Sequence, residues 1–117
     1  FVSIHINSVN NAPNANGTEV YYADSNNGNA YGTTSEKLAT NILNRMLYYM
    51  GSTNRGVKTA EHAVTKRCEM PAALTEVGFI TNPTEVYNMT TDEYQYKAAQ
   101  GIAEGIMITL KDINVPQ

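Results

Sequence analysis

The chain lacks most of the features that assign a protein to a specialised class on composition alone. It contains one cysteine, Cys68, so no internal disulfide can form and no CxxC pair is available for a metal knuckle. The net charge of −3 and the absence of a basic patch give no reason to expect nucleic acid or anionic lipid as a partner. No apolar run approaches the length of a membrane span. The single cysteine is compatible with a cytosolic protein and with a secreted bacterial one.

The sequence also has no starting methionine and no charged, apolar leader. It opens at Phe1 in what reads as a buried strand, and a domain seldom begins in that way. We therefore expect that any secretion signal has been removed or lies outside the given sequence. We also expect that residues belonging to this fold precede Phe1, so that 1–117 is a partial domain.

The residues that are present have the composition of a globular protein, with 42% hydrophobic and 16% charged residues. A chain of this length can bury roughly two thirds of its unfolded surface, so we expect one domain that folds without disulfides. Residue periodicity predicts strands at 1–7, 18–22, 72–80 and, near the middle, 63–67, and helices at 33–50, 84–89 and 90–113. This order is typical of an α/β layer fold that lacks its first strand or two.

The two longest predicted helices begin with capping boxes, Thr33 with Glu36 and Thr90 with Glu93. Methionines on the first of these helices are expected to fill the core rather than to bind a cofactor. The last helix contains two glycines, which weaken it but permit a close approach to the sheet. These are Gly101 and Gly105.

Glu76 is the single carboxylate in an apolar run that ends abruptly at Pro83. A carboxylate in such a strand is costly to desolvate unless a metal, a base or a substrate faces it, so Glu76 is a candidate functional residue. Two other interpretations stay open at this point. Glu76 could be a buried carboxylate satisfied by its neighbours, or a residue at the end of a strand that faces water.

His5 lies near the carboxyl end of the first predicted strand, and reacting groups gather at such ends in open α/β sheets. Taken alone, a strand histidine is more often a hydrogen-bonded core residue. The hypothesis that His5 is a functional residue therefore depends on its pairing with Glu76. Arg55 and Lys58 could contact an anionic or carbonyl-rich ligand, although solvated side chains are the more common case. His62 has no second histidine at ligand spacing and is expected to be a surface or structural residue. Cys68 shows no nucleophile signature.

Four segments, taken in order, resemble the zinc-dependent N-acetylmuramoyl-L-alanine amidases of the type-3 family, which trim bacterial peptidoglycan. They are FVSIHINS, NGTEVYY, NRGVK and MPAALTEVGFITNP. The resemblance implies a mixed twisted sheet flanked by helices, of the phosphorylase/hydrolase-like kind, with one Zn²⁺ held by two histidines and a glutamate. It puts the last zinc ligand on His5 and the catalytic glutamate on Glu76. The other two ligands of the family precede the SIH motif and are absent here, so the chain as given is expected to hold zinc weakly and to be inactive.

The activity implied by the resemblance is hydrolysis of the amide between N-acetylmuramic acid and the L-alanine of the stem peptide. Asn7 and Arg55 are the candidates for contacting this peptidoglycan substrate. A secreted or cell-wall location and a monomer are expected. Two rival interpretations remain: a non-catalytic peptidoglycan-binding relic, and a related zinc exopeptidase that acts on free peptides.

Overall fold

The computed structural model describes residues 1–28 and 30–113 of the chain. Within these residues the strands are β1 (Val2–Asn7), β2 (Thr18–Tyr22), β3 (Asn54–Thr59) and β4 (Ala73–Phe79). The helices are α1 (Ser35–Met50), α2 (Ala63–Lys66), α3 (Pro83–Met89) and α4 (Asp92–Leu110), with a short 3-10 turn, η1 (Asp24–Asn26), after β2.

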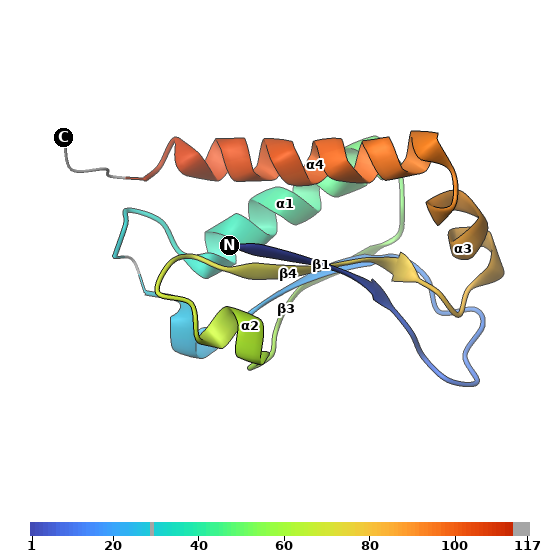
Figure 1. Ribbon diagram of the computed structural model, residues 1–117, viewed down its shortest axis with the longest axis horizontal. Helices are drawn as coiled ribbons and strands as arrows, with labels where there is room; N and C mark the ends of the chain where they lie inside the picture. The colour runs from blue at the N-terminus through green and yellow to red at the C-terminus, as the bar shows by residue number, and fades with distance from the viewer. Residues whose placement is uncertain (29, 114–117) are drawn as a thin grey trace.

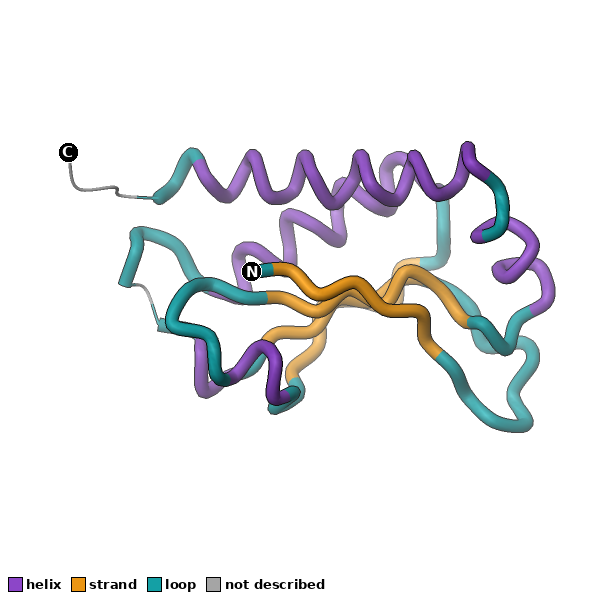
Figure 2. The backbone as a smooth tube through the Cα atoms, viewed as in Figure 1, coloured by secondary structure: helices purple, strands orange, loops and turns teal. Residues whose placement is uncertain are grey.

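The strands form one mixed sheet in the order β1-β4-β2-β3. β1 runs parallel to β4, β3 runs parallel to β2, and β2 and β4 are antiparallel. Figures 1 and 2 show α1 and α4 on one face of the twisted sheet, whereas α2 lies on the opposite side. The predicted α/β fold with a mixed sheet flanked by helices is therefore confirmed.

The hydrophobic core lies between the sheet and α1, with α4 packed over both. The apolar stripe of α1 meets the apolar faces of β2 and β4, and Met46 is fully buried there, as expected of a residue that fills the core. The other buried members of this cluster are Val20, Tyr22, Leu38, Ala39, Ile42, Leu43, Ala73, Val77, Ala98 and Ile102. Side chains alternate along each strand, so burying this face leaves the polar side chains on the other.

Gly101 and Gly105 do permit a close approach, but to α1 rather than to the sheet as predicted. A Cβ atom added at Gly105 would lie 2.5 Å from the Cα of Ile42, and one added at Gly101 would lie 2.5 Å from the Cα of Met46. Backbone at that distance cannot accommodate even a methyl group. The two glycines therefore set how tightly α4 packs on α1.

The strand predicted at 63–67 is wrong, because Ala63–Lys66 is the helix α2. The missing strand is β3, which the periodicity does not reveal. Gly56 has a φ of +88° inside it, and its N–H is bonded to the Asn54 side chain 2.8 Å away, so regular alternation is broken.

The caps predicted for α1 and α4 are each one residue too early, whereas the helix predicted at 84–89 begins one residue sooner than predicted, at Pro83 of α3. Thr34 caps α1 by accepting from the Lys37 N–H, and Thr91 caps α4 by accepting from the Tyr94 N–H. In both places two threonines stand side by side, so the sequence pattern cannot tell which one is the cap. The last helix also ends at Leu110, short of the predicted boundary at residue 113.

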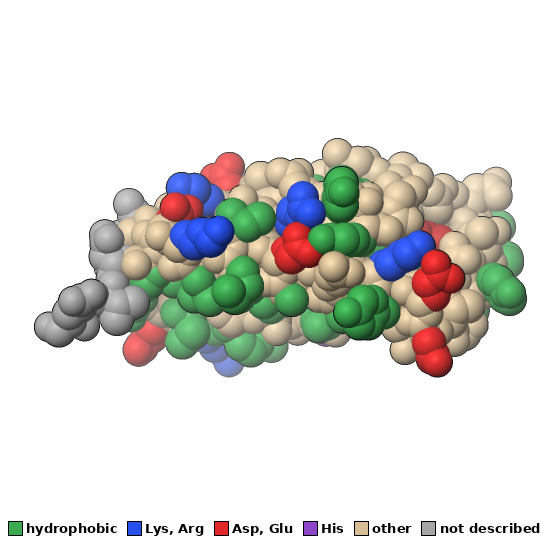
Figure 3. Space-filling view, turned by 90° about the horizontal axis from the view of Figure 1, so that it is seen from above, with side chains coloured by type: hydrophobic (Ala, Val, Ile, Leu, Met, Phe, Trp, Pro, Cys, Tyr) green, Lys and Arg blue, Asp and Glu red, His purple; other side chains and the backbone are tan. Residues whose placement is uncertain are grey.

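An apolar groove runs between β1, which is at the edge of the sheet, and α4. Ile4 and Ile6 are 62% and 53% exposed there, and the groove continues onto Met89 and Ile102. Figure 3 shows hydrophobic side chains gathered along one long side of the molecule. Among the helices that the structure describes, none is both long enough and apolar enough to cross a membrane.

Candidate active site

Strand register brings three polar side chains into one row across the face of the sheet opposite α1 and α4, the uncovered face. His5 of β1 pairs with Glu76 of β4, and Glu76 in turn pairs with Glu19 of β2. Residues paired across a ladder point to the same face. His5 and Glu76, which the sequence singles out, are therefore neighbours on the face opposite α1 and α4, and Glu19 joins them.

A bulge in β4 extends this row by one more position. The next pair after His5 and Glu76 is Asn7 with Phe79, so one residue of β1 stands opposite two residues of β4. Bulges of this kind occur next to active sites, where they redirect a side chain. Here the bulge returns Phe79 to the same face as Asn7.

Glu76 is half-buried, and its Oε2 atom is buried with no hydrogen-bond partner within residues 1–28 and 30–113. Burial raises the pKa of the Glu76 carboxyl above its ordinary value, the nearby His5 opposes the rise, and the negative charge of Glu19 adds to it. A carboxylate with a raised pKa and an unused oxygen is suited to accept a proton from a bound molecule.

Glu19 has the opposite surroundings, since it is 2% exposed and its carboxylate is fully engaged. Oε1 accepts from the Asn7 amide at 2.7 Å and from the Tyr21 hydroxyl at 2.9 Å. Oε2 accepts from Arg55 Nε at 3.2 Å and from the Lys58 ammonium. Burial raises the pKa of this carboxyl, but the bonds to Lys58, Tyr21 and Arg55 outweigh that effect and hold the pKa below its usual value.

The predicted substrate contacts, Asn7 and Arg55, both lie on this face, and both donate to Glu19. The Arg55 guanidinium also lies over the Phe79 ring, 4.8 Å from its centroid. Lys58 is bound to Glu19 as well, so Arg55 and Lys58 are both ion-paired, although their side chains remain partly exposed to solvent as expected.

Tyr21 and His62 form the side of the row nearest β3 and α2. Their rings meet edge to face with centroids 5.2 Å apart, and His62 Nδ1 is a buried atom without a partner among the described residues. Burial and the hydrogen bond to Glu19 raise the pKa of Tyr21 to about 12. His62, expected to be a surface or structural residue, therefore packs against the candidate site.

Glu19 carries only one weak signal in the sequence. The alternation in β2 puts Glu19 and Tyr21 on the polar face, but nothing local shows that this face continues onto β4. The sequence separates Glu19 from Lys58 by almost 40 residues and from Glu76 by almost 60. The contact becomes visible only when the strand order is known.

The described residues do not complete a metal site. Within residues 1–28 and 30–113, no group of three or more His, Cys, Asp or Glu side chains could hold a metal ion. His5 is exposed, and its Nε2 lies 2.8 Å from the Ser3 hydroxyl oxygen. A catalytic zinc site requires three protein ligands and an open position.

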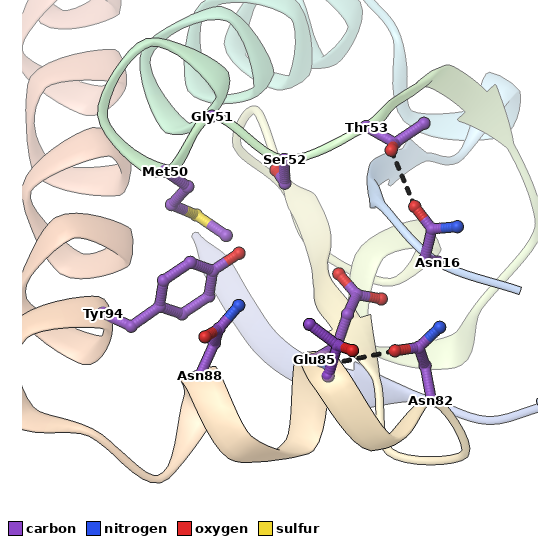
Figure 4. A pocket seen from close by; sticks show the side chains of 10 residues that line it. Asn16, Met50, Gly51, Ser52, Thr53, Asn82, Glu85, Asn88 and Tyr94 are labelled. Carbon is purple, nitrogen blue, oxygen red and sulfur yellow. Dashed lines mark hydrogen bonds between the residues drawn. The ribbon is translucent and has the colours of Figure 1, made fainter. Parts of the chain in front are cut away.

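A polar cleft of about 360 Å³ lies elsewhere, between the ends of α1, α3 and the start of α4 (Figure 4). Its most buried side chain is Glu85, whose Oε1 accepts the backbone N–H groups of Gly17 at 2.9 Å and Phe79 at 3.0 Å. These bonds tie the start of β2 to the end of β4. Neither His5 nor Glu76 lines this cleft, so it is separate from the candidate site.

Comparisons with known proteins agree on one family. The profile of the family described as N-acetylmuramoyl-L-alanine amidase matches residues 1–107. The chain is 38% identical over 106 residues to the uncharacterised protein YqiI of Bacillus subtilis, covering 91% of this chain and 48% of YqiI. It is 37% identical over 105 residues to the N-acetylmuramoyl-L-alanine amidase LytC of the same organism, covering 90% of this chain and 20% of LytC.

Solved structures give the same result. The chain matches the N-acetylmuramoyl-L-alanine amidase AmiC2 of Nostoc punctiforme with a TM-score of 0.83 and 38% identity, over 95% of this chain and 57% of AmiC2. It matches an N-acetylmuramoyl-L-alanine amidase from Clostridium difficile 630 with a TM-score of 0.86 and 31% identity, over 94% of this chain and 56% of that one. The chain thus spans little more than half of the length of these structures, and half or less of the two curated relatives.

Proposed function

The chain belongs to the N-acetylmuramoyl-L-alanine amidase family, and from this premise we propose that residues 1–117 form part of the single catalytic domain of a peptidoglycan hydrolase. Its substrate is the amide between N-acetylmuramic acid and the L-alanine of the stem peptide. The observation that carries the proposal is the pairing of His5 with Glu76 on the uncovered face, with one buried oxygen of Glu76 unpartnered there.

Glu76 acts as the general base in this proposal. Its free Oε2 accepts a proton from the attacking water, and the resulting carboxylic acid delivers that proton to the departing amine. The raised pKa of Glu76 suits both steps, because the group must take a proton and then give it up. Asn7 and Arg55 remain the proposed substrate contacts.

His5 would supply one ligand of the zinc ion that the family resemblance implies. The other protein ligands would have to come from outside residues 1–28 and 30–113, because these contain no complete ligand set. A zinc ion bound there would polarise the scissile carbonyl and make the attacking water more acidic. The names of the relatives, which include cell wall amidases, support a secreted protein that acts at the cell wall.

The test uses the full-length protein that contains this chain, loaded with Zn²⁺ and supplied with purified sacculi. We expect release of stem peptides that begin with L-alanine, and we expect Glu76→Gln to lower the rate by about 10²- to 10⁴-fold. Glu104→Gln is the matched control, since Glu104 is bound to Arg45 between α1 and α4, away from the site. Full activity of Glu76→Gln would refute the role given to Glu76.

A non-catalytic peptidoglycan-binding domain is the second candidate, and it is favoured by the lack of any group of three possible metal ligands within residues 1–28 and 30–113. Such a domain would bind sacculi equally well with and without zinc and release no peptide from them. A zinc exopeptidase would instead cleave simple free peptides. The same assay, run on sacculi and on a free tetrapeptide, separates the three functions.

A further inference from the structure

We propose that Glu19 is a positioning residue of the candidate site, holding Arg55 and Lys58 on the face that carries Glu76 as a subsite for a carboxylate of the substrate's peptide. The inference rests on the proposed function, because it names the group that this part of the site recognises. It concerns a residue that itself makes no contact with the reacting atoms.

Glu19 is bound by donors from three strands. Asn7 comes from β1, Tyr21 from β2, and Arg55 and Lys58 from β3. An ionised carboxylate offers about four acceptor positions, and these four donors use them all. Glu19 therefore has no capacity left to accept a proton from substrate or to bind a metal, in contrast to Glu76 with its free oxygen.

Stability alone is a poor explanation for this cluster. Buried ion pairs are often no more stabilising than apolar residues of similar volume, because desolvation opposes the attraction between the charges. Fixing Arg55 and Lys58 also costs side-chain entropy. What the cluster does provide is geometry, because the guanidinium is held between the Glu19 carboxylate and the Phe79 ring.

The charges of the cluster point to an anionic ligand. Two cations surround the Glu19 carboxylate, so Glu19, Arg55 and Lys58 together carry one net positive charge on the face that bears His5 and Glu76. The Lys58 side chain is 40% exposed and that of Arg55 is 34% exposed, so both can reach a bound molecule while Glu19 stays buried. The stem peptide ends in a carboxylate, and a guanidinium held in one orientation recognises that group well.

The experiment measures kcat and KM of the full-length, zinc-loaded protein on a soluble muramoyl-peptide fragment. We expect Glu19→Gln to raise KM by about ten- to a hundredfold, with kcat changed by less than about threefold, because the lost alignment weakens substrate binding and spares Glu76. On a fragment whose terminal carboxylate is amidated, wild type and Glu19→Gln should have the same KM. Glu104→Gln, which also breaks a bond to an arginine, should leave both constants unchanged.

A purely structural role would lower the apparent kcat in proportion to the unfolded fraction and leave KM unchanged, and it would make no distinction between the acid and the amide. An unchanged KM in folded Glu19→Gln, or an equal effect on both fragments, overturns the proposal. Should Glu19→Gln fail to fold, Arg55→Lys is the second variant. It keeps the charge but loses the Nε donor and the flat contact with Phe79, and an unchanged KM there also overturns the proposal.

A readout without activity separates this inference from the proposed function. The Arg55 Nε–H group should give a protected NMR signal in the wild type that disappears in Glu19→Gln. If the wild type shows no amidase activity, the proposed function fails, while the Arg55 signal and the binding of the two fragments still decide the role of Glu19. A signal that persists in Glu19→Gln shows that Glu19 does not hold Arg55.

Discussion

The two faces of the sheet are built on different principles. The face under α1 and α4 is a continuous apolar cluster in which many residues share the burial. The uncovered face depends on a few polar groups, chiefly the row of His5, Glu76 and Glu19, whose positions follow from strand register. The covered face should therefore determine whether the chain folds, and the uncovered face should determine what it does.

The largest effect on stability is expected at the centre of the covered face. Met46 is 0% exposed, so Met46→Ala should lower the free energy of unfolding by about 2–5 kcal/mol. Met107, on the outer side of α4, is 59% exposed, and Met107→Ala should change that free energy by less than about 0.5 kcal/mol. Urea denaturation of both variants checks the pair. Equal losses would show that the covered face is not a specifically packed core.

The packing of α4 on α1 gives the next effect. Gly105→Ala puts a methyl group where the Ile42 backbone lies, and such overpacking typically costs about 1–3 kcal/mol. Gly28→Ala is the control, because a Cβ atom added there meets no neighbour within 4 Å. Thermal unfolding should show a lower Tm for Gly105→Ala only. A Tm equal to that of the wild type would mean that the helices can separate at little cost.

The difference between the faces also explains how much could be predicted from the sequence. The covered face follows from local periodicity, so α1, α4, β2 and β4 are predicted with their apolar sides correct. Hydrophobic spacing of this kind can be recognised in the sequence without knowledge of the topology. The errors at the helix starts are one-residue shifts, as at the adjacent Thr33 and Thr34, where the two candidates have the same side chain, and α4 ends at Leu110, three residues before the predicted boundary at 113.

On the uncovered face the sequence predicts single residues but not their arrangement. Glu76 stands out because a carboxylate interrupts an apolar run, and His5 because of the strand in which it lies. The sequence does not predict β3, because Gly56 breaks its alternation. Without β3, the surroundings of Arg55 cannot be predicted either. The bond from Arg55 to Glu19 depends on β2 and β3 being neighbours, which is a property of the topology and not of either segment.

Acid should act on the uncovered face through Glu19. The pKa of Glu19 is lower in the folded protein than in the unfolded chain, so its ionisation contributes stability above the unfolded pKa of about 4.3. That contribution is lost as the pH falls through the folded pKa. We therefore expect the free energy of unfolding of the wild type to fall below about pH 4 more steeply than that of Glu19→Gln. Parallel curves from pH 6 to pH 2.5, measured by urea denaturation, would contradict the ion-paired state of Glu19.

The smallest effect on stability, and the sharpest test of the comparison, is expected at Glu76. Its Oε2 is buried without a partner in the part of the chain that the structure describes, and burial of the charged group opposes folding. Replacing the carboxylate by the uncharged amide of similar shape in Glu76→Gln should leave the free energy of unfolding unchanged or raise it, by no more than about 1 kcal/mol. The same substitution is expected to remove most of the activity. Functional groups are often held in surroundings that do not favour them, and removing such a group relieves the cost. A marked loss of stability in Glu76→Gln at neutral pH would instead show that Glu76 is an ordinary structural carboxylate, satisfied by contacts within the fold, and the division of labour between the two faces would no longer hold.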